Sequence, residues 1–87
     1  MKIKNEYVLK SLGDNLFVIV NQASSYDLSK MISVNETGAY IFNLLKKNLT
    51  KADILKSLVN EYDVNELKAN EDFDLFINKL RSNNILE

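Results

Sequence analysis

Short apolar runs separated by polar breaks fill the first third of the chain and predict β-strands. Residues 7–12 form one such run, and residues 16–20 form a second that is rich in β-branched and aromatic side chains. The Gly-Asp-Asn sequence between them, at 13–15, is typical of a turn. Residues 28–34 then alternate, so that Leu28, Lys30, Ile32 and Val34 share one face. We therefore expect three antiparallel strands, arranged as a meander.

The rest of the chain has apolar residues at helical spacing and predicts three helices. We expect them at about 36–47, 51–62 and from just after residue 65 to about 82. Asn35 and Thr50 suit the N-caps of the first two, because their side-chain oxygens can accept hydrogen bonds from free backbone N–H groups. The core positions expected in the third helix are Leu67, Ala69, Phe73, Phe76, Ile77 and Leu80. This order predicts an α+β fold with a winged helix-turn-helix outline, in which a three-stranded antiparallel sheet precedes three helices.

The length and composition narrow the class of protein. A chain of 87 residues is expected to form a single domain, over residues 1–87. It contains no Cys and no His, which excludes disulfides, cysteine nucleophiles, Ser-His-Asp triads and the common zinc and haem sites. Its two glycines cannot build a phosphate-binding loop. We therefore expect a protein that is not an enzyme and has no metal or cofactor.

The remaining composition bears on location and on DNA binding. The longest apolar run has five residues, at 16–20, so we expect no signal segment, no membrane contact and a cytoplasmic location. Winged helices often bind DNA through their third helix. Residues 63–74, at the start of that helix, carry a net charge of −4, which would repel phosphates. We therefore expect no nucleic-acid partner, although a DNA-binding regulator remains an alternative.

Residues 32–45 resemble the middle motif of the PqqD-like family, small proteins named after a component of pyrroloquinoline quinone biosynthesis. In that motif a strand runs into Leu-Asn-x-Thr-Gly-Ala and then into a helix that bears an aromatic residue. Val34 stands where the family has Leu. The matching positions are Asn35, Thr37, Gly38, Ala39 and Phe42.

The resemblance extends over roughly residues 7–86. Thr50 resembles the start of the family's second helix, and residues 61–64, Glu-Tyr-Asp-Val, resemble its next turn. Asp72 and Phe73, with the apolar positions that follow as far as residues 85–86, resemble its closing helix and tail. Membership would imply a stand-alone precursor-peptide recognition element. Such proteins bind the leader segment of a ribosomally made, post-translationally modified peptide and present that peptide to a maturation enzyme.

The resemblance also implies where the leader binds. In the family the leader adds as a strand to the edge of the third β-strand and lies against the third helix. Leu75 falls off the predicted core stripe of that helix, among charged residues, so it is either a groove floor or a scattered exposed leucine. The candidate peptide-binding residues are Leu28, Lys30, Met31, Ile32 and Ser33 on the strand, and Lys68, Asp72, Leu75, Phe76 and Lys79 on the helix.

The expected partners are therefore a precursor peptide and a modifying enzyme, such as a radical SAM maturase or a leader peptidase. An open edge strand with one lysine and no proline suits pairing with a peptide. A protein–protein adaptor that uses the same groove for another partner remains a further alternative.

Overall fold

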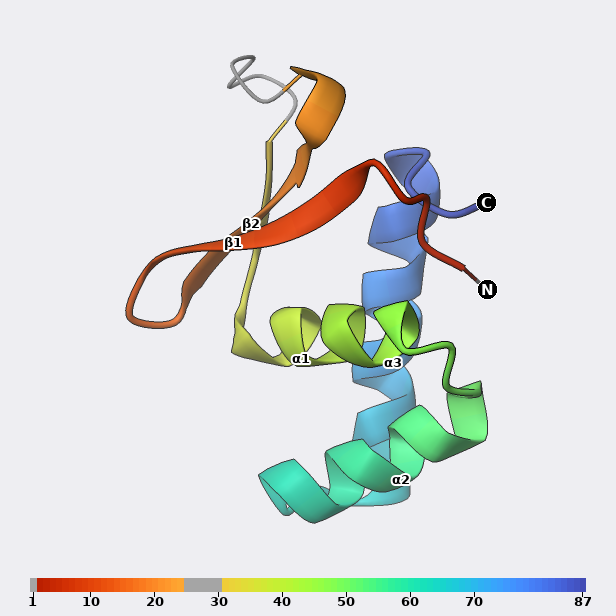
Figure 1. Cartoon of the computed structure of the whole chain (residues 1–87). Helices are drawn as coiled ribbons and strands as arrows, with labels where there is room; N and C mark the ends of the chain where they lie inside the picture. The colour runs from red at the N-terminus through yellow and green to blue at the C-terminus, as the bar shows by residue number, and fades with distance from the viewer. Residues whose placement is uncertain (1, 25–30) are drawn as a thin grey trace.

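The computed structural model of the chain describes residues 2–24 and 31–87 (Figure 1). Three antiparallel strands, β1 (Tyr7–Gly13), β2 (Leu16–Asn21) and β3 (Ile32–Val34), form a sheet in the order β1-β2-β3. A 3-10 turn, η1 (Gln22–Ser24), follows β2. Three helices then complete the chain, so the predicted α+β fold is confirmed.

The sheet has the predicted meander connectivity. The β1–β2 hairpin turns at residues 13–15, where Asn15 adopts a positive φ of 57°, a conformation that asparagine tolerates well. In β3, Ile32 pairs with Ile19 and Val34 pairs with Phe17. Of the strand predicted over residues 28–34, β3 confirms Ile32–Val34, and Met31 lies just before it. The predicted positions Leu28 and Lys30 lie outside the described residues.

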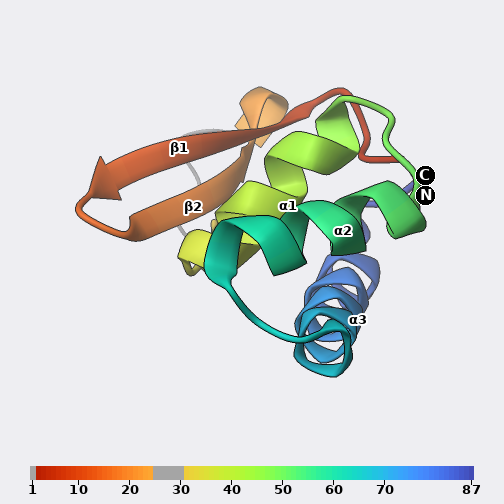
Figure 2. The ribbon, with the colours of Figure 1, turned by 90° about the horizontal axis from the view of Figure 1, so that it is seen from below.

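The helices are α1 (Glu36–Lys46), α2 (Lys51–Tyr62) and α3 (Glu66–Ser82). Each begins at a capped residue. The Asn35 and Asn65 side chains each accept a 2.8 Å hydrogen bond from the backbone N–H three residues on, and Thr50 accepts one of 3.2 Å in the same way. Viewed along α3, the first two helices lie on one side of it, and the hairpin projects beyond them (Figure 2).

The core lies where the sheet and all three helices meet. Ile19 from β2, Ile41 and Phe42 from α1, and Phe73 and Leu80 from α3 are all fully or almost fully buried. The predicted stripe of α3 is confirmed at five of its six positions.

The prediction is wrong for the sixth position, Leu67, because its side chain is 70% exposed. At about 100° per residue, it lies roughly 135° around the helix from the centre of the buried stripe. It also sits in the first turn of α3, where the helix has only just begun at Glu66. An apolar side chain in that position faces away from the core.

The two ends of the described chain pair with each other next to the end of α3 (Figure 1). The Lys4 N–H donates to the Ile85 carbonyl at 2.9 Å, and the Glu87 N–H donates to the Lys2 carbonyl at 2.8 Å. Ile3 and Ile85 are both buried in the core cluster. This pairing, which no local pattern in the sequence indicates, ties the segment before β1 to the segment after α3.

Candidate functional site

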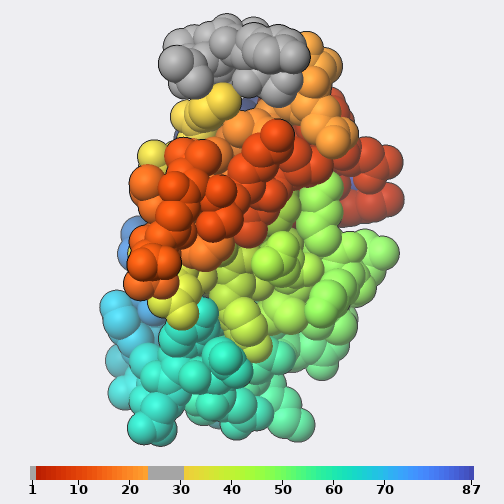
Figure 3. Space-filling model, turned by 60° about the vertical axis from the view of Figure 1, so that its left-hand side comes forward, coloured from red at the N-terminus to blue at the C-terminus, as the bar shows by residue number. Residues whose placement is uncertain are grey.

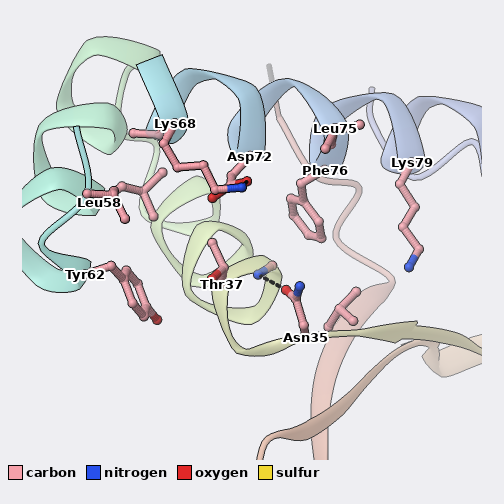
Figure 4. Close-up of a pocket in the computed structure, with 13 residues that line it drawn as sticks. Asn35, Thr37, Leu58, Tyr62, Lys68, Asp72, Leu75, Phe76 and Lys79 are labelled. Atoms are coloured by element: carbon pink, nitrogen blue, oxygen red, sulfur yellow. Dashed lines mark hydrogen bonds and ion pairs between the residues drawn. The ribbon is translucent and has the colours of Figure 1, made fainter. Parts of the chain in front are cut away.

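A groove of about 540 Å³ opens between one face of α3, the start of α1 and the end of α2. Figure 4 shows Lys68, Asp72, Leu75, Phe76 and Lys79 along the α3 side of this groove. All five are predicted site residues, and the structure brings them together because they lie within about 100° of one another around the helix. In the space-filling view, strands β1 and β2 lie above α1, and α2 lies below it (Figure 3).

The floor of the groove forms where α1 meets α3. Phe76 is only 7% exposed, and its ring lies against the backbone of Gly38. A Cβ atom at position 38 would lie 3.0 Å from Cε1 of Phe76 and 3.3 Å from Cβ of Val34, which is tighter than ordinary van der Waals contact. The absence of a side chain at Gly38 therefore lets β3, α1 and α3 approach closely at this point.

The α3 rim of the groove combines one apolar side chain with charged ones. Leu75 is 70% exposed and lines the groove, which confirms that it lies off the core stripe. The Lys68 ammonium and the Asp72 carboxylate form an ion pair at 3.0 Å, since residues four apart lie on the same face of a helix. These two charges largely satisfy each other.

The other end of the groove reaches the edge of the sheet. β3 is the last strand in the β1-β2-β3 order, so within residues 2–24 and 31–87 its outer edge pairs with no further strand. The Lys79 ammonium extends from α3 toward this edge (Figure 4), and it donates a hydrogen bond to the Ser33 carbonyl. Ser33 is therefore joined to the α3 residues through Lys79.

The other two predicted strand residues that the structure describes lie apart from the groove. Ile32 is half-buried and packs against the hydrophobic core. Met31 is also half-buried, and it precedes the strand. Neither is among the residues that line the groove as the structure describes it.

Reasoning from the sequence missed the wall of the groove opposite α3. Thr37 from α1, Tyr62 from the end of α2 and Val64 from the following turn all line it, as Figure 4 shows for the first two. The sequence motifs Thr-Gly-Ala and Tyr-Asp-Val contain these residues, so the positions that carry the family resemblance were the available signal. Asn35, the predicted helix cap, both caps α1 and lines the groove.

The tyrosine in this wall has a perturbed acidity. Burial raises the pKa of the Tyr62 hydroxyl above its ordinary value, and the negative charges of Glu36 and Glu61 raise it further. The Tyr62 ring also packs edge-to-face on Tyr40, with 5.4 Å between ring centroids. At neutral pH the hydroxyl is therefore protonated and gives the groove a polar, uncharged group.

Residues 2–24 and 31–87 contain no group of three or more His, Cys, Asp and Glu side chains placed to hold a metal ion. In the same residues, no helix combines the length and the apolar character that crossing a membrane requires.

No curated protein matches the chain. Among solved structures, the chain is similar to TbiB1 in complex with the TbiA(beta) leader peptide. The TM-score is 0.79 and the identity 22%, over 100% of this chain and 95% of that one. At this identity the likeness establishes the fold. Residues 6–86 match the family described as coenzyme PQQ synthesis protein D (PqqD), and the chain therefore belongs to the PqqD family.

Proposed function

We propose that this protein binds the leader segment of a ribosomally synthesised, post-translationally modified precursor peptide and delivers it to a maturation enzyme. The observation that carries the proposal is the outer edge of β3 beside a groove with an apolar floor. In this mechanism the leader adds as a strand, so that backbone hydrogen bonds give affinity and the groove selects side chains. The protein itself contributes recognition and no catalysis.

The geometry of the edge suits strand addition. Backbone groups alternate sides along an antiparallel strand, and the Ser33 carbonyl accepts a bond from Lys79 on α3. Ser33 therefore directs its N–H and C=O away from β2, toward the side on which a peptide would pair. A peptide strand lies about 4.8 Å from its neighbour, which would place it between β3 and the α3 rim.

The proposed leader contacts divide into backbone and side-chain groups. Met31 and Ser33 would offer backbone hydrogen bonds, and Ile32 would hold the strand on the core. Leu75 and Phe76 would contact apolar leader side chains. The polar contacts would come from Lys68, Asp72 and Lys79.

Family membership supports this proposal, and the similar fold of a protein solved with a leader peptide adds to it. The receiving enzyme would be one that acts on such precursors, for example a radical SAM maturase or a leader peptidase. DNA binding gains no support from the charges on α3. Asp72 and Asp74 form ion pairs with Lys68 and Lys51, which occupies two of the lysines that would otherwise face phosphates.

The test is an amide chemical-shift titration of labelled protein. The titrant is the leader half of the small precursor encoded beside the gene, and the core half is the control. We expect the leader to shift amides at 31–37 and 68–79 and to saturate near micromolar, about −8 kcal/mol. An absence of shifts with the leader half would refute the proposal and favour an adaptor with another partner.

Two substitutions test the groove itself. Leu75→Glu places a charge in the proposed apolar contact and should abolish leader binding. Leu67→Glu is its matched control, since Leu67 is also 70% exposed on α3 but does not line the groove. Met31→Pro removes an N–H at the start of the edge and should also abolish binding. Circular dichroism should show all three variants folded, and unchanged affinity in both Leu75→Glu and Met31→Pro would show that the groove is wrongly assigned.

A further inference from the structure

The contact between Lys79 and Ser33 lies on the backbone edge that the proposed leader would use. The Lys79 side chain is exposed on α3, and its ammonium donates to the Ser33 carbonyl 46 residues earlier in the chain. That carbonyl is the acceptor which a peptide strand on the outer side of β3 would take with its own N–H. The lysine and an added strand therefore compete for the same oxygen.

Lys79 differs in its ionic partners from Lys68, the other lysine in the groove. Lys68 is neutralised by Asp72 at 3.0 Å. By contrast, no carboxylate among residues 2–24 and 31–87 lies within ion-pair distance of the Lys79 ammonium. Once its carbonyl partner is taken, the Lys79 ammonium at the groove rim has no carboxylate from residues 2–24 and 31–87 to pair with.

We infer that Lys79 protects the β3 edge reversibly. In the free protein its ammonium binds the Ser33 carbonyl, and after a leader strand has displaced it from that carbonyl it pairs with a leader carboxylate. Lys79 is thus a specificity-determining residue that selects a leader with Asp or Glu close to the position that pairs with Ser33. This inference rests on the proposed function and adds a chemical requirement to the leader.

Physical considerations favour an acidic peptide over a second copy of this chain as the occupant. An unpaired edge strand invites pairing, and a lysine at the edge opposes it. If two β3 edges paired, both Lys79 side chains would lose their Ser33 acceptors and would meet at one interface as like charges. A strand that carries a carboxylate gives the Lys79 ammonium a new acceptor in place of the Ser33 carbonyl. The exchange therefore costs little free energy only with such a partner.

The first test needs no peptide. In labelled Lys79→Met protein, we expect the carbonyl carbon resonance of Ser33 to move upfield, because the carbonyl has lost a charged hydrogen-bond donor. Lys79→Arg should largely restore the wild-type resonance. Lys68→Met, which removes the other groove lysine, should leave it unchanged. An unchanged Ser33 resonance in Lys79→Met would show that Lys79 does not bind the Ser33 carbonyl in the free protein, and it would overturn the inference.

The second test measures the exchange with the leader half of the precursor encoded beside the gene. Each acidic residue of that leader is changed in turn to its amide, and each peptide is titrated into wild-type and Lys79→Met protein. We expect one position at which the amide weakens binding to the wild type by about three- to fivefold, as for an exposed ion pair. The same change should have no effect on Lys79→Met, and the difference should shrink at 1 M salt.

The possible outcomes distinguish a failure of the Lys79 inference from a failure of the proposed function. If the leader binds wild-type protein but no acidic position distinguishes it from Lys79→Met, the selection by Lys79 is wrong and the proposed function stands. If Lys68→Met rather than Lys79→Met removes the sensitivity, Lys79 is not the selecting residue. A wild-type protein that binds no leader at all refutes the proposed function, and the exchange with it.

Discussion

Replacement of Gly38 by alanine tests how the groove is built. Gly38 lies in the first turn of α1, where its N–H donates to the Asn35 cap and its Cα faces the Phe76 ring. A new methyl group would meet two ring carbons of Phe76 at 3.0 and 3.1 Å and Cβ of Val34 at 3.3 Å. The ring must therefore shift by a few tenths of an ångström.

Two opposing terms set the size of the effect. Alanine is better than glycine within a helix by about 0.5–1 kcal/mol, which favours the variant. Overpacking of a well-filled site costs about 1–3 kcal/mol, and Phe76 belongs to the buried core cluster. We expect the packing term to win, with a net loss of about 1 kcal/mol in the free energy of unfolding. For a domain of this size, that lowers Tm by about 4–8 °C.

The assay is chemical denaturation, combined with a double-mutant cycle. Phe76→Leu removes the ring carbons that the new methyl would meet, so Gly38→Ala should cost nothing in that background or should stabilise slightly. The coupling between the two changes should therefore be about 1 kcal/mol or more. If Gly38→Ala is as stable as the wild type, or costs the same with and without the Phe76 ring, close approach is not the reason for the glycine.

Three other changes test the surrounding structure. Asn35→Ala removes the α1 cap and should lower the free energy of unfolding by about 1 kcal/mol in urea denaturation. Ile85→Ala, at a fully buried position, should cost about 2–4 kcal/mol in the same assay, whereas Leu12→Ala at the exposed hairpin should cost less than about 0.5. Tyr62 has a pKa raised above 10.0 in the folded state, so its contribution to stability is complete below pH 10 and is lost as the pH rises through the folded value. Thermal melts from pH 8 to 11 should therefore show a smaller alkaline loss in Tyr62→Phe than in Tyr7→Phe.

The elements of the fold were predictable because their signals are local. The caps Asn35 and Thr50 and the apolar periodicity placed α1 and α2 almost to the residue. Leu67 shows the limit of counting apolar residues, since its angle around α3 decides its exposure more than its side chain does. The pairing of Ile3 with Leu86 joins segments more than 80 residues apart, and no local pattern indicates such a contact.

The site was predictable on one side only. A helical wheel is sufficient to place Leu75 beside Lys68, Asp72 and Lys79, so the α3 rim followed from spacing. The opposite wall required knowledge of how α2 packs against α3. Tyr62 belongs to the apolar spacing of α2, and that spacing alone does not show that the tyrosine lines a groove shared with α1 and α3.

The junction between β3 and α1 explains how the edge and the groove keep a fixed relation. Only Asn35 separates the last strand residue, Val34, from the first helical residue, and its side chain is bound to the Gly38 N–H at 2.8 Å. The same glycine is held against Phe76 on α3. The strand edge is thereby connected to the α3 face through one capped turn and one close contact. Because side chains alternate along a strand, a leader that pairs with Ser33 would then present its residues to Leu75 and Lys79 in one register, and a slip by one residue would turn every side chain away from the groove.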